Sequence, residues 1–186
     1  MIYVSDKLVY YKSLLNLEYD DAVQSLIKKY GAALDDYFKE SSYNKFLNGK
    51  IKSPNKGKTS RTKDGLYCHH IDEDKFLNLG NKDFILVKKP NFKYQTKDRL
   101  VYCNLIEHLI LHAIITKKTN GEFGTPGLIV FLIPKVQEWY INKRKPRSDW
   151  EMNCYNTALI SSDEAKELLN DIKLYLKSVK VVQQYL

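Results

Sequence analysis

The distribution of histidines is the feature that most constrains this chain. The sequence contains four histidines, and all of them lie in two short segments, residues 65–71 and 100–112. Histidines that only satisfy carbonyl groups in a core would not be expected to gather in this way. We therefore expect the fold to bring the two segments together around one polar site.

The first segment, residues 65–71, has the pattern of a short β-strand. It begins with a glycine and is otherwise apolar and aromatic, which favours a strand. It carries His69 and His70 next to each other. Since successive residues of a strand point to opposite faces, we expect the two imidazoles to have different roles.

The second segment changes its period at Asn104. Residues 100–103 are strand-like, whereas the apolar residues after Asn104 recur at helical spacing. Asn104 is a favourable N-cap, and Glu107 three residues later completes a capping-box pattern, so a helix is predicted to begin there. On this helix His108 and His112 are four residues apart and share one face, as paired metal ligands must.

A strand with a His-His pair, a second strand and a helix with His-x-x-x-His resemble the HNH nucleases of the ββα-metal finger fold, especially colicin-type DNases and many phage endonucleases. The resemblance covers roughly residues 65–117. It implies that His69, His108 and His112 bind a metal ion and that His70 is the general base. The position of the family's orienting Asn is Arg99 in this chain, so the resemblance leaves Arg99 as a candidate catalytic residue.

Several groups are candidates for orienting His70 in place of that Asn. Besides Arg99, they are Asn78, Asn81 and a backbone carbonyl. Asn78 and Asn81 lie in the long connection between the two predicted strands. Such a long connection usually carries function or structure of its own. Its first acids, Asp72, Glu73 and Asp74, are interpreted first as exposed turn residues and second as a source of an oxygen ligand.

The resemblance implies one divalent metal ion as cofactor. HNH nucleases are often active with Mg²⁺ or Mn²⁺, whereas ligation by imidazoles alone favours Zn²⁺ or Ni²⁺. The predicted function is a metal-dependent HNH endonuclease that hydrolyses DNA phosphodiester bonds, of phage, restriction or mobile-element origin. The alternative is a non-catalytic nucleic-acid-binding protein in which the histidines hold a structural zinc.

The charge of the chain favours a polyanionic partner. The formal net charge is +8 and the sequence pI is about 9.2. Residues 48–64 hold six Lys and Arg against one acid, among Gly, Pro, Ser and Thr, and are predicted to form a flexible basic arm just before the first histidine strand. The residues expected to contact DNA phosphates are Lys56, Lys58, Arg61 and Lys63.

With 186 residues and 44% hydrophobic content, the chain can bury the core of one domain. The predicted fold class is α+β, a mainly helical domain built around a ββα-metal finger. It comprises N-terminal helices and the basic arm in 1–64, the motif in 65–117 and a C-terminal helical extension in 118–186. Without a leader or a membrane-spanning apolar stretch, the protein is expected to be cytoplasmic, with no membrane partner.

The three cysteines form no Cys-x-x-Cys motif, so neither a disulfide framework nor a cysteine zinc knuckle is predicted. Cys68 and Cys103 are interpreted as buried strand residues, with a cysteine nucleophile as the alternative. Further helices are predicted over 20–30, 33–39, 42–47, over 128–141 as a buried helix interrupted at Pro134, and from Ser161 or Ser162. Residues 143–147 are expected to be a charged surface turn.

Overall fold

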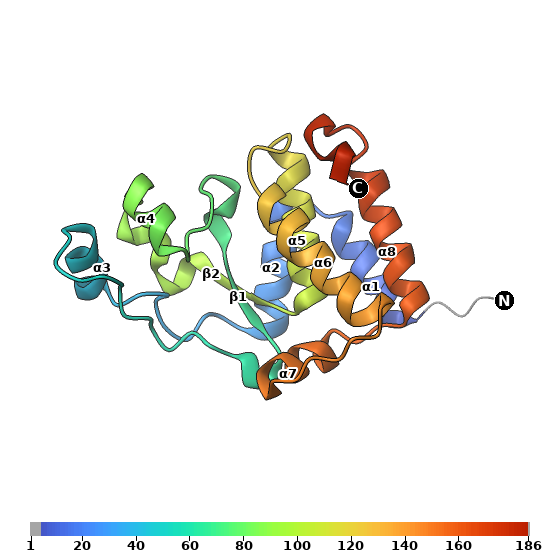
Figure 1. Ribbon diagram of the computed structural model, residues 1–186, viewed down its shortest axis with the longest axis horizontal. Coiled ribbons are helices and arrows are strands. Elements are labelled where there is room, and N and C mark those ends of the chain that lie inside the picture. Colours follow the sequence, from blue (N-terminus) through green and yellow to red (C-terminus); the bar gives the residue numbers. More distant parts are fainter. Residues whose placement is uncertain (1–4, 186) are drawn as a thin grey trace.

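The computed structural model describes residues 5–185 and is mainly helical, with one small sheet. Figure 1 shows the two strands between a larger group of helices and a smaller group that contains α3 and α4. The predicted fold class, a mainly helical α+β domain, is confirmed. Residues 1–4 and 186, which belong to the predicted N-terminal and C-terminal parts, lie outside the described residues.

Three helices precede the sheet: α1 (Asp6–Leu15), α2 (Tyr19–Tyr30) and α3 (Glu40–Leu47). The helices predicted over 20–30 and 42–47 are confirmed. Gly31 ends α2 with a φ of 82°, a conformation that glycine adopts without steric cost. The sequence pattern did not distinguish helix from strand in the region of α1.

The helix predicted over residues 33–39 is wrong. The segment is irregular, because tertiary hydrogen bonds take the backbone groups that a helix would use. The N–H of Tyr37 donates to the carbonyl of Gln95 at 2.7 Å, and the N–H of Lys39 donates to that of Asn55 at 2.9 Å. These hydrogen bonds outweigh a weak local helix propensity and carry Tyr37 toward the sheet.

The strand-strand-helix order around the histidines is confirmed. Strand β1 (Tyr67–His70) pairs with β2 (Leu100–Cys103) in antiparallel register, with His70 opposite Leu100. Helix α5 (Leu105–Lys118) follows at once, and the Asn104–Glu107 capping box is formed in both directions. The local rules that predicted this start of a helix therefore fix where the helical histidines lie relative to the strands.

The long connection between the strands has structure of its own, as expected. It contains the 3₁₀ turn Ile71–Asp74, helix α4 (Lys82–Lys88) and two further 3₁₀ turns, Phe92–Gln95 and Lys97–Arg99. Together with α3 it forms the smaller group of helices, which has its own apolar cluster of Phe38, Tyr43, Phe46 and Ile85. This group, which we call the small lobe, faces the sheet from the side opposite α6 (Figure 1).

The stretch after α5 is helical but changes type twice. A π-helical turn (Gly127–Leu132) leads into α6 (Ile133–Val136) and a second π-helical turn (Gln137–Ile141). Pro134 lies in the first turn of α6, so the predicted interruption is a change of helical type without a break. The prediction that the whole stretch is buried is wrong, because Phe131 is 63% exposed.

Two helices close the chain. Helix α8 (Ser162–Tyr175) begins after Ser161 with a capping box to Glu164, as predicted, and the 3₁₀ turn Lys180–Tyr185 follows it. Helix α7 (Asp149–Thr157) was not predicted, because its residues show little apolar periodicity. The basic segment 143–147 forms the turn that leads into α7.

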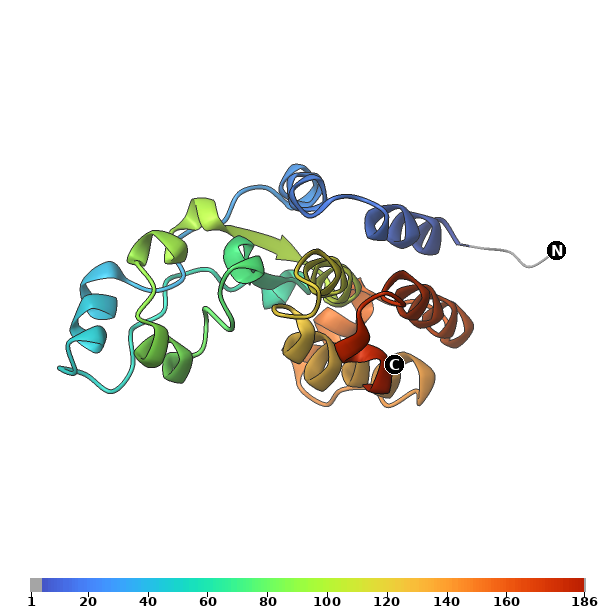
Figure 2. The same cartoon turned by 90° about the horizontal axis from the view of Figure 1, so that it is seen from above.

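Helix α5 lies at the centre of the main core. Every residue from 105 to 116 except His108 is buried, and α1, α2, α6 and α8 pack around it. Figure 2 shows α5 between α1 and α2 on one side and the C-terminal helices on the other. Among the helices of residues 5–185, none combines the length and apolarity needed to cross a bilayer.

Candidate metal and catalytic site

Three imidazoles meet where β1 approaches α5. His69 comes from the strand, and His108 and His112 come from successive turns of the helix. One nitrogen from each ring lies within 4.8 Å of the other two, and the ring centroids are 4.9–5.3 Å apart. The structure thus brings together the three residues that the sequence predicted as ligands.

Hydrogen bonds determine which nitrogens are free. Nδ1 of His112 lies 3.0 Å from the carbonyl oxygen of Gly124 and must therefore carry the proton, which leaves the Nε2 lone pair available. The hydroxyl of Tyr19 donates to the carbonyl of Ile71 at 2.8 Å, so at 3.1 Å it accepts a hydrogen bond from Nε2 of His69. The Nδ1 lone pair of His69 is consequently free as well.

The ligand chemistry of the three imidazoles fits a divalent cation. Nδ1 of His69 and Nδ1 of His108 are buried and have no hydrogen-bond partner within the described chain, which is rare for buried polar atoms. Burial and the neighbouring imidazoles lower the pKa of His69 and His108 well below the usual value, and burial lowers the pKa of His112 to about 4. All three are therefore neutral, the form that binds metals.

Glu73 adds an oxygen to this group. Its Oε2 lies 3.5 Å from Nε2 of His112 and 3.8 Å from Nδ1 of His69, and its Oε1 lies 4.0 Å from Nδ1 of His70. Burial raises the pKa of Glu73 to about 7. The second interpretation of the three acids, a source of an oxygen ligand, is therefore the one that the position of Glu73 favours.

The first interpretation, exposed turn residues, is wrong for the flanking acids. Asp72 and Asp74 are both buried, because the 3₁₀ turn after β1 folds the chain back against the protein. The charge of Asp72 is compensated by Arg99, and that of Asp74 by Lys118 at 2.7 Å. Burial raises the pKa of Asp72, but hydrogen bonds from Arg99 and Lys75 outweigh it and leave this pKa below its usual value.

His70 lies beside the three imidazoles but is held by other groups. Its Nε2 is 3.0 Å from Oε1 of Gln95, and the Gln95 amide donates to the carbonyl of Leu79 at 3.0 Å. This donation turns Oε1 toward His70, so Nε2 of His70 carries the proton and its Nδ1 is the basic atom. The ring of Tyr37 packs on His70 with 4.4 Å between centroids.

Gln95 therefore orients the His70 ring, a role for which the sequence suggested Arg99, Asn78, Asn81 or a backbone carbonyl. Asn78 and Asn81 line the same cavity as His70 but form no hydrogen bond with it in the described structure. Arg99 lies outside this cavity, in a neighbouring hollow, and its Nε and Nη2 donate to Asp72 at 2.7 and 2.6 Å. The structure thus places Arg99 as a brace of the turn after His70, away from the histidines.

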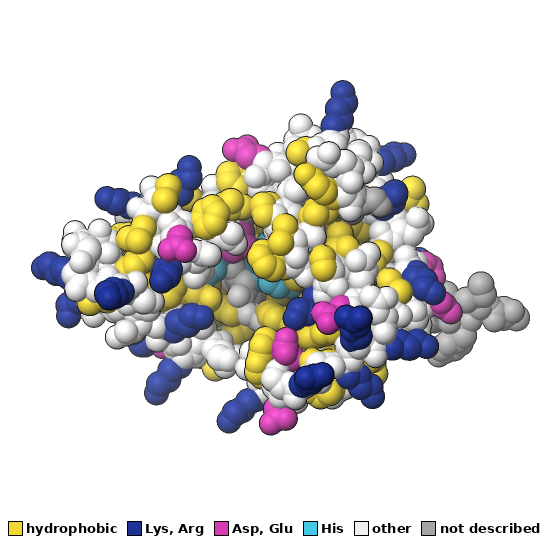
Figure 3. Space-filling view, viewed as in Figure 1, with side chains coloured by type: hydrophobic (Ala, Val, Ile, Leu, Met, Phe, Trp, Pro, Cys, Tyr) yellow, Lys and Arg dark blue, Asp and Glu magenta, His cyan; other side chains and the backbone are white. Residues whose placement is uncertain are grey.

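The four histidines line one cavity of about 350 Å³, with Glu73 and Tyr37 in its wall. Figure 3 shows histidine side chains at the bottom of a hollow between the small lobe and the larger group of helices. Cys68 also lines this cavity, but burial raises its pKa to about 12. The thiol stays protonated at neutral pH, which argues against a cysteine nucleophile.

The predicted basic arm is anchored to the protein. The backbone of Lys56 forms a bridge with Phe38. The Arg61 guanidinium donates to the carbonyl of Tyr30 at 2.7 Å and to Asp64 at 2.8 Å. Arg61 is thus engaged in internal hydrogen bonds, whereas the other three residues expected to contact DNA phosphates are exposed: Lys56, Lys58 and Lys63.

The arm reaches the histidine cavity through Lys56. Its Nζ lies 5.6 Å from the ring centroid of Tyr37, and Tyr37 in turn lines the cavity and packs on His70. An arm lysine therefore lies next to a side chain of the cavity wall.

Comparison of the chain with protein-family models, with curated proteins and with solved structures finds no match. The assignment of a function therefore depends on the chemistry of the residues themselves. Sequence reasoning missed Gln95, because nothing in the sequence around it marked it. It named Glu73, with Asp72 and Asp74, as a source of an oxygen ligand but ranked that interpretation second.

Proposed function

We propose that this protein is a metal-dependent endonuclease of the HNH type that hydrolyses phosphodiester bonds of DNA in the cytoplasm. The observation that carries the proposal is the meeting of three imidazoles, those of His69, His108 and His112, with a fourth beside them in the same cavity. The order of strand, strand and capped helix around them supports it.

In this proposal His69, His108 and His112 would hold one divalent cation, and Glu73 would offer a carboxylate oxygen beside them. A cation held there would neutralise charge on the phosphate and stabilise the departing 3′ oxygen. Imidazoles favour Zn²⁺ or Ni²⁺, whereas a carboxylate suits Mg²⁺ or Mn²⁺. Because the ligand set is mixed, we favour Mn²⁺, which accepts both kinds of ligand.

His70 is the proposed general base. A water oxygen attacks the phosphorus, the bond from phosphorus to the 3′ oxygen breaks, and the water proton passes to Nδ1 of His70. Gln95 keeps that nitrogen unprotonated by accepting the hydrogen bond from Nε2. Burial lowers the pKa of His70 to about 4, so at neutral pH the imidazole is neutral and its Nδ1 can accept a proton.

A second candidate function is favoured by the burial of the ligands. His69 and His112 are buried, as ligands of a closed structural site are. In this alternative the histidines hold a structural zinc in a DNA-binding protein without catalytic activity. The basic arm serves both functions, so binding of DNA alone does not separate them.

Cleavage of supercoiled plasmid separates the two candidates. Purified protein is treated with EDTA, and Mg²⁺, Mn²⁺, Ni²⁺ or Zn²⁺ is then added back. We expect nicking with at least one metal, and a loss of roughly a hundredfold or more in His70→Ala, which should still bind metal and DNA. Cys68→Ala, in the same cavity, is the matched control and should cleave like the wild type.

Two outcomes would contradict the nuclease assignment. The first is nicking by His70→Ala at the wild-type rate in a preparation free of contaminating nuclease. The second is the absence of cleavage with every metal, by a protein that binds both metal and DNA, which would establish the structural-zinc alternative.

A further inference from the structure

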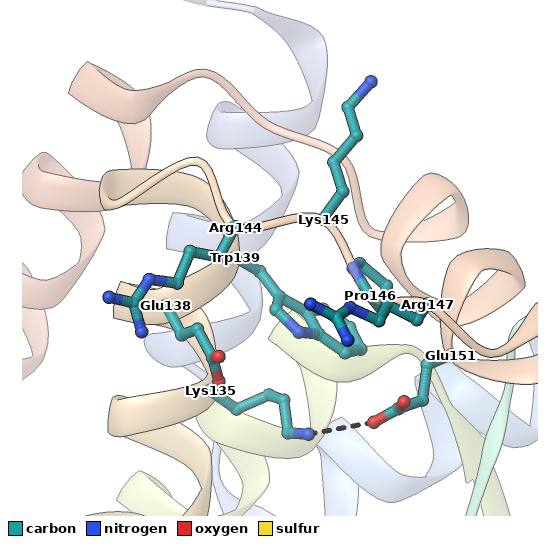
Figure 4. Close-up of a pocket in the computed structure, with 8 residues that line it drawn as sticks. All are labelled: Lys135, Glu138, Trp139, Arg144, Lys145, Pro146, Arg147 and Glu151. Carbon is teal, nitrogen blue, oxygen red and sulfur yellow. Dashed lines mark hydrogen bonds and ion pairs between the residues drawn. The ribbon is translucent and has the colours of Figure 1, made fainter.

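A second cavity lies outside the histidine site, between α6, the turn 143–147 and the start of α7. Its volume is about 640 Å³. Figure 4 shows the residues that line it, which we call the basic pocket: Lys135, Glu138, Trp139, Arg144, Lys145, Pro146, Arg147 and Glu151. Residues 143–147 are the charged surface turn that the sequence predicted, and this turn also forms one wall of the cavity.

The basic pocket has four cations against two acids, Glu138 and Glu151, and three of the cations have no acidic partner among the described residues: Arg144, Lys145 and Arg147. Glu151 is already compensated, because it pairs with Lys135 at 3.1 Å and accepts a hydrogen bond from Ser148 at 2.8 Å. Arg144 and Arg147 have no acidic partner in the described part of the chain. Guanidinium groups bind phosphate through two parallel hydrogen bonds, which suits them to a phosphate ligand.

Trp139 supplies a further hydrogen-bond donor to the pocket. Its side chain lines the pocket and is only 2% exposed, and its indole N–H has no hydrogen-bond acceptor among residues 5–185. The indole nitrogen is not among the described buried atoms that lack a partner, so this N–H is accessible from the pocket. The oxygen of a ligand in the pocket would accept a hydrogen bond from it.

The start of α7 adds a further donor. Ser148, the N-cap residue, does not cap the backbone N–H groups of this nine-residue helix, because its hydroxyl donates to the Glu151 carboxylate instead. The uncapped N–H groups and the positive end of the helix dipole favour an anion, although Asp149 and Glu151 already lie in the first turn. A phosphate group is therefore the ligand that suits all the donors of this pocket: the two arginines, the indole N–H and the start of α7.

The basic pocket and the histidine cavity share one helical stretch. Phe131 and Leu132 line the histidine cavity, and Lys135 and Trp139 line the basic pocket. From residue 131 to residue 139 a helix rises by about 12 Å at about 1.5 Å per residue. One DNA strand covers this distance in roughly three to four nucleotides at about 3.4 Å each.

We propose that the basic pocket binds a backbone phosphate of the DNA strand whose scissile phosphate lies in the histidine cavity. The identity of the strand rests on the proposed nuclease function, whereas the preference for a phosphate group follows from the pocket alone. The other source of the same chemistry is the phosphate of a small molecule.

Fluorescence of Trp139 tests the proposal directly. The chain has two tryptophans, and Trp150 is half exposed, so Trp150→Phe leaves Trp139 as the reporter. In EDTA, we expect a short single-stranded oligonucleotide to change the fluorescence of this variant. Adding Arg144→Ala and Arg147→Ala should remove this fluorescence change. The two substitutions should also lower the slope of log K for oligonucleotide binding against log salt concentration by about 1.4, which is about 0.7 for each phosphate that an arginine no longer neutralises.

A charge-matched control separates the pocket from general attraction. Lys28→Ala with Lys177→Ala removes two exposed lysines from α2 and from beyond the end of α8. This variant should keep the fluorescence change. Circular dichroism should show that all variants are folded.

Several results would overturn the proposal. One is an unchanged fluorescence response and salt slope in the variant that lacks Arg144 and Arg147. Another is saturation of the response by inorganic phosphate at concentrations as low as those of the oligonucleotide, which would indicate a small-molecule site. A Trp139 response without cleavage under any metal supports the pocket and contradicts the nuclease, whereas cleavage without that response contradicts the pocket alone.

Discussion

Replacement of Gln95 by methionine tests how His70 is held. Gln95 is fully buried and makes two hydrogen bonds of 3.0 Å, one with Nε2 of His70 and one with the carbonyl of Leu79. Methionine has a similar length and fills the space, but its thioether replaces neither bond. The substitution therefore leaves the His70 N–H and the Leu79 carbonyl buried without partners.

Each stranded polar group costs about 1–3 kcal/mol, so Gln95→Met should lower the free energy of unfolding by about 2–6 kcal/mol. The rate of cleavage should fall further than this instability explains. Without Gln95, neither the tautomer nor the orientation of His70 is fixed, and misplacement of a catalytic group by about 1 Å can cost roughly a hundredfold. Metal content should not change, because Gln95 does not contact the three ligand imidazoles.

The matched control is Gln95→Glu. A carboxylate still accepts the hydrogen bond from Nε2 of His70 but can no longer donate to Leu79. Denaturant unfolding should therefore show a loss of stability in both variants. Plasmid nicking, at a temperature where both are folded, should be retained largely by the glutamate variant and lost by the methionine variant.

The reasoning would be refuted by a folded Gln95→Met protein that nicks plasmid at the wild-type rate. It would also fail if the methionine and glutamate variants lost activity equally. In that case Gln95 would only stabilise the fold, and His70 would not depend on it for its tautomer.

Three other predictions address the metal ligands and the arm. Elemental analysis should find about one divalent ion per chain. The double variant His108→Ala, His112→Ala should lose this ion, and metal at a hundred times Kd should no longer raise its free energy of unfolding by about 2.7 kcal/mol. Unchanged metal content in this variant would exclude the site. Gly127→Ala should weaken metal binding by tenfold or more although every histidine is still present. The added Cβ would lie 2.4 Å from Cε1 of His112, so the ring must move by more than a metal bond tolerates. Equal metal affinity of variant and wild type in calorimetry would contradict this. Replacing Lys56, Lys58 and Lys63 with alanine should reduce the salt slope of duplex DNA binding by about 0.9 for each phosphate that a lysine had neutralised. An unchanged slope would show that these three lysines do not touch DNA.

The relative position of His108 and His112, two of the proposed metal ligands, could be predicted from the sequence because it depends on local rules. The capping box at Asn104 fixes where α5 begins, and spacing by four residues then places His108 over His112. The burial of α5 could also be predicted from its apolar residues. Prediction succeeded wherever neighbours in the sequence determined the geometry.

The groups around His70 could not be predicted in this way. Gln95 is 25 residues from His70 in the sequence, and its position depends on the path of a connection made of short 3₁₀ turns. No periodicity or motif determines such a path. Glu73 is close in sequence, but its orientation depends on a 3₁₀ turn that composition alone does not distinguish from an exposed turn.

The wrong helix at 33–39 and the missed Gln95 have one physical cause. The backbone carbonyl of Gln95 accepts the N–H of Tyr37, and its side chain accepts the N–H of His70, so a single residue positions both rings that pack on each other. A helix over 33–39 would use the Tyr37 N–H internally and take its ring away from His70. Local preference is thus overruled where the chain builds the surroundings of the proposed base, as expected where function places demands on a fold. The proposed metal ligands lie on β1 and α5, which are regular elements, whereas the proposed base is held by irregular segments that join the small lobe. A substitution that disturbs the small lobe should therefore lower the rate of cleavage more than it lowers the affinity for metal.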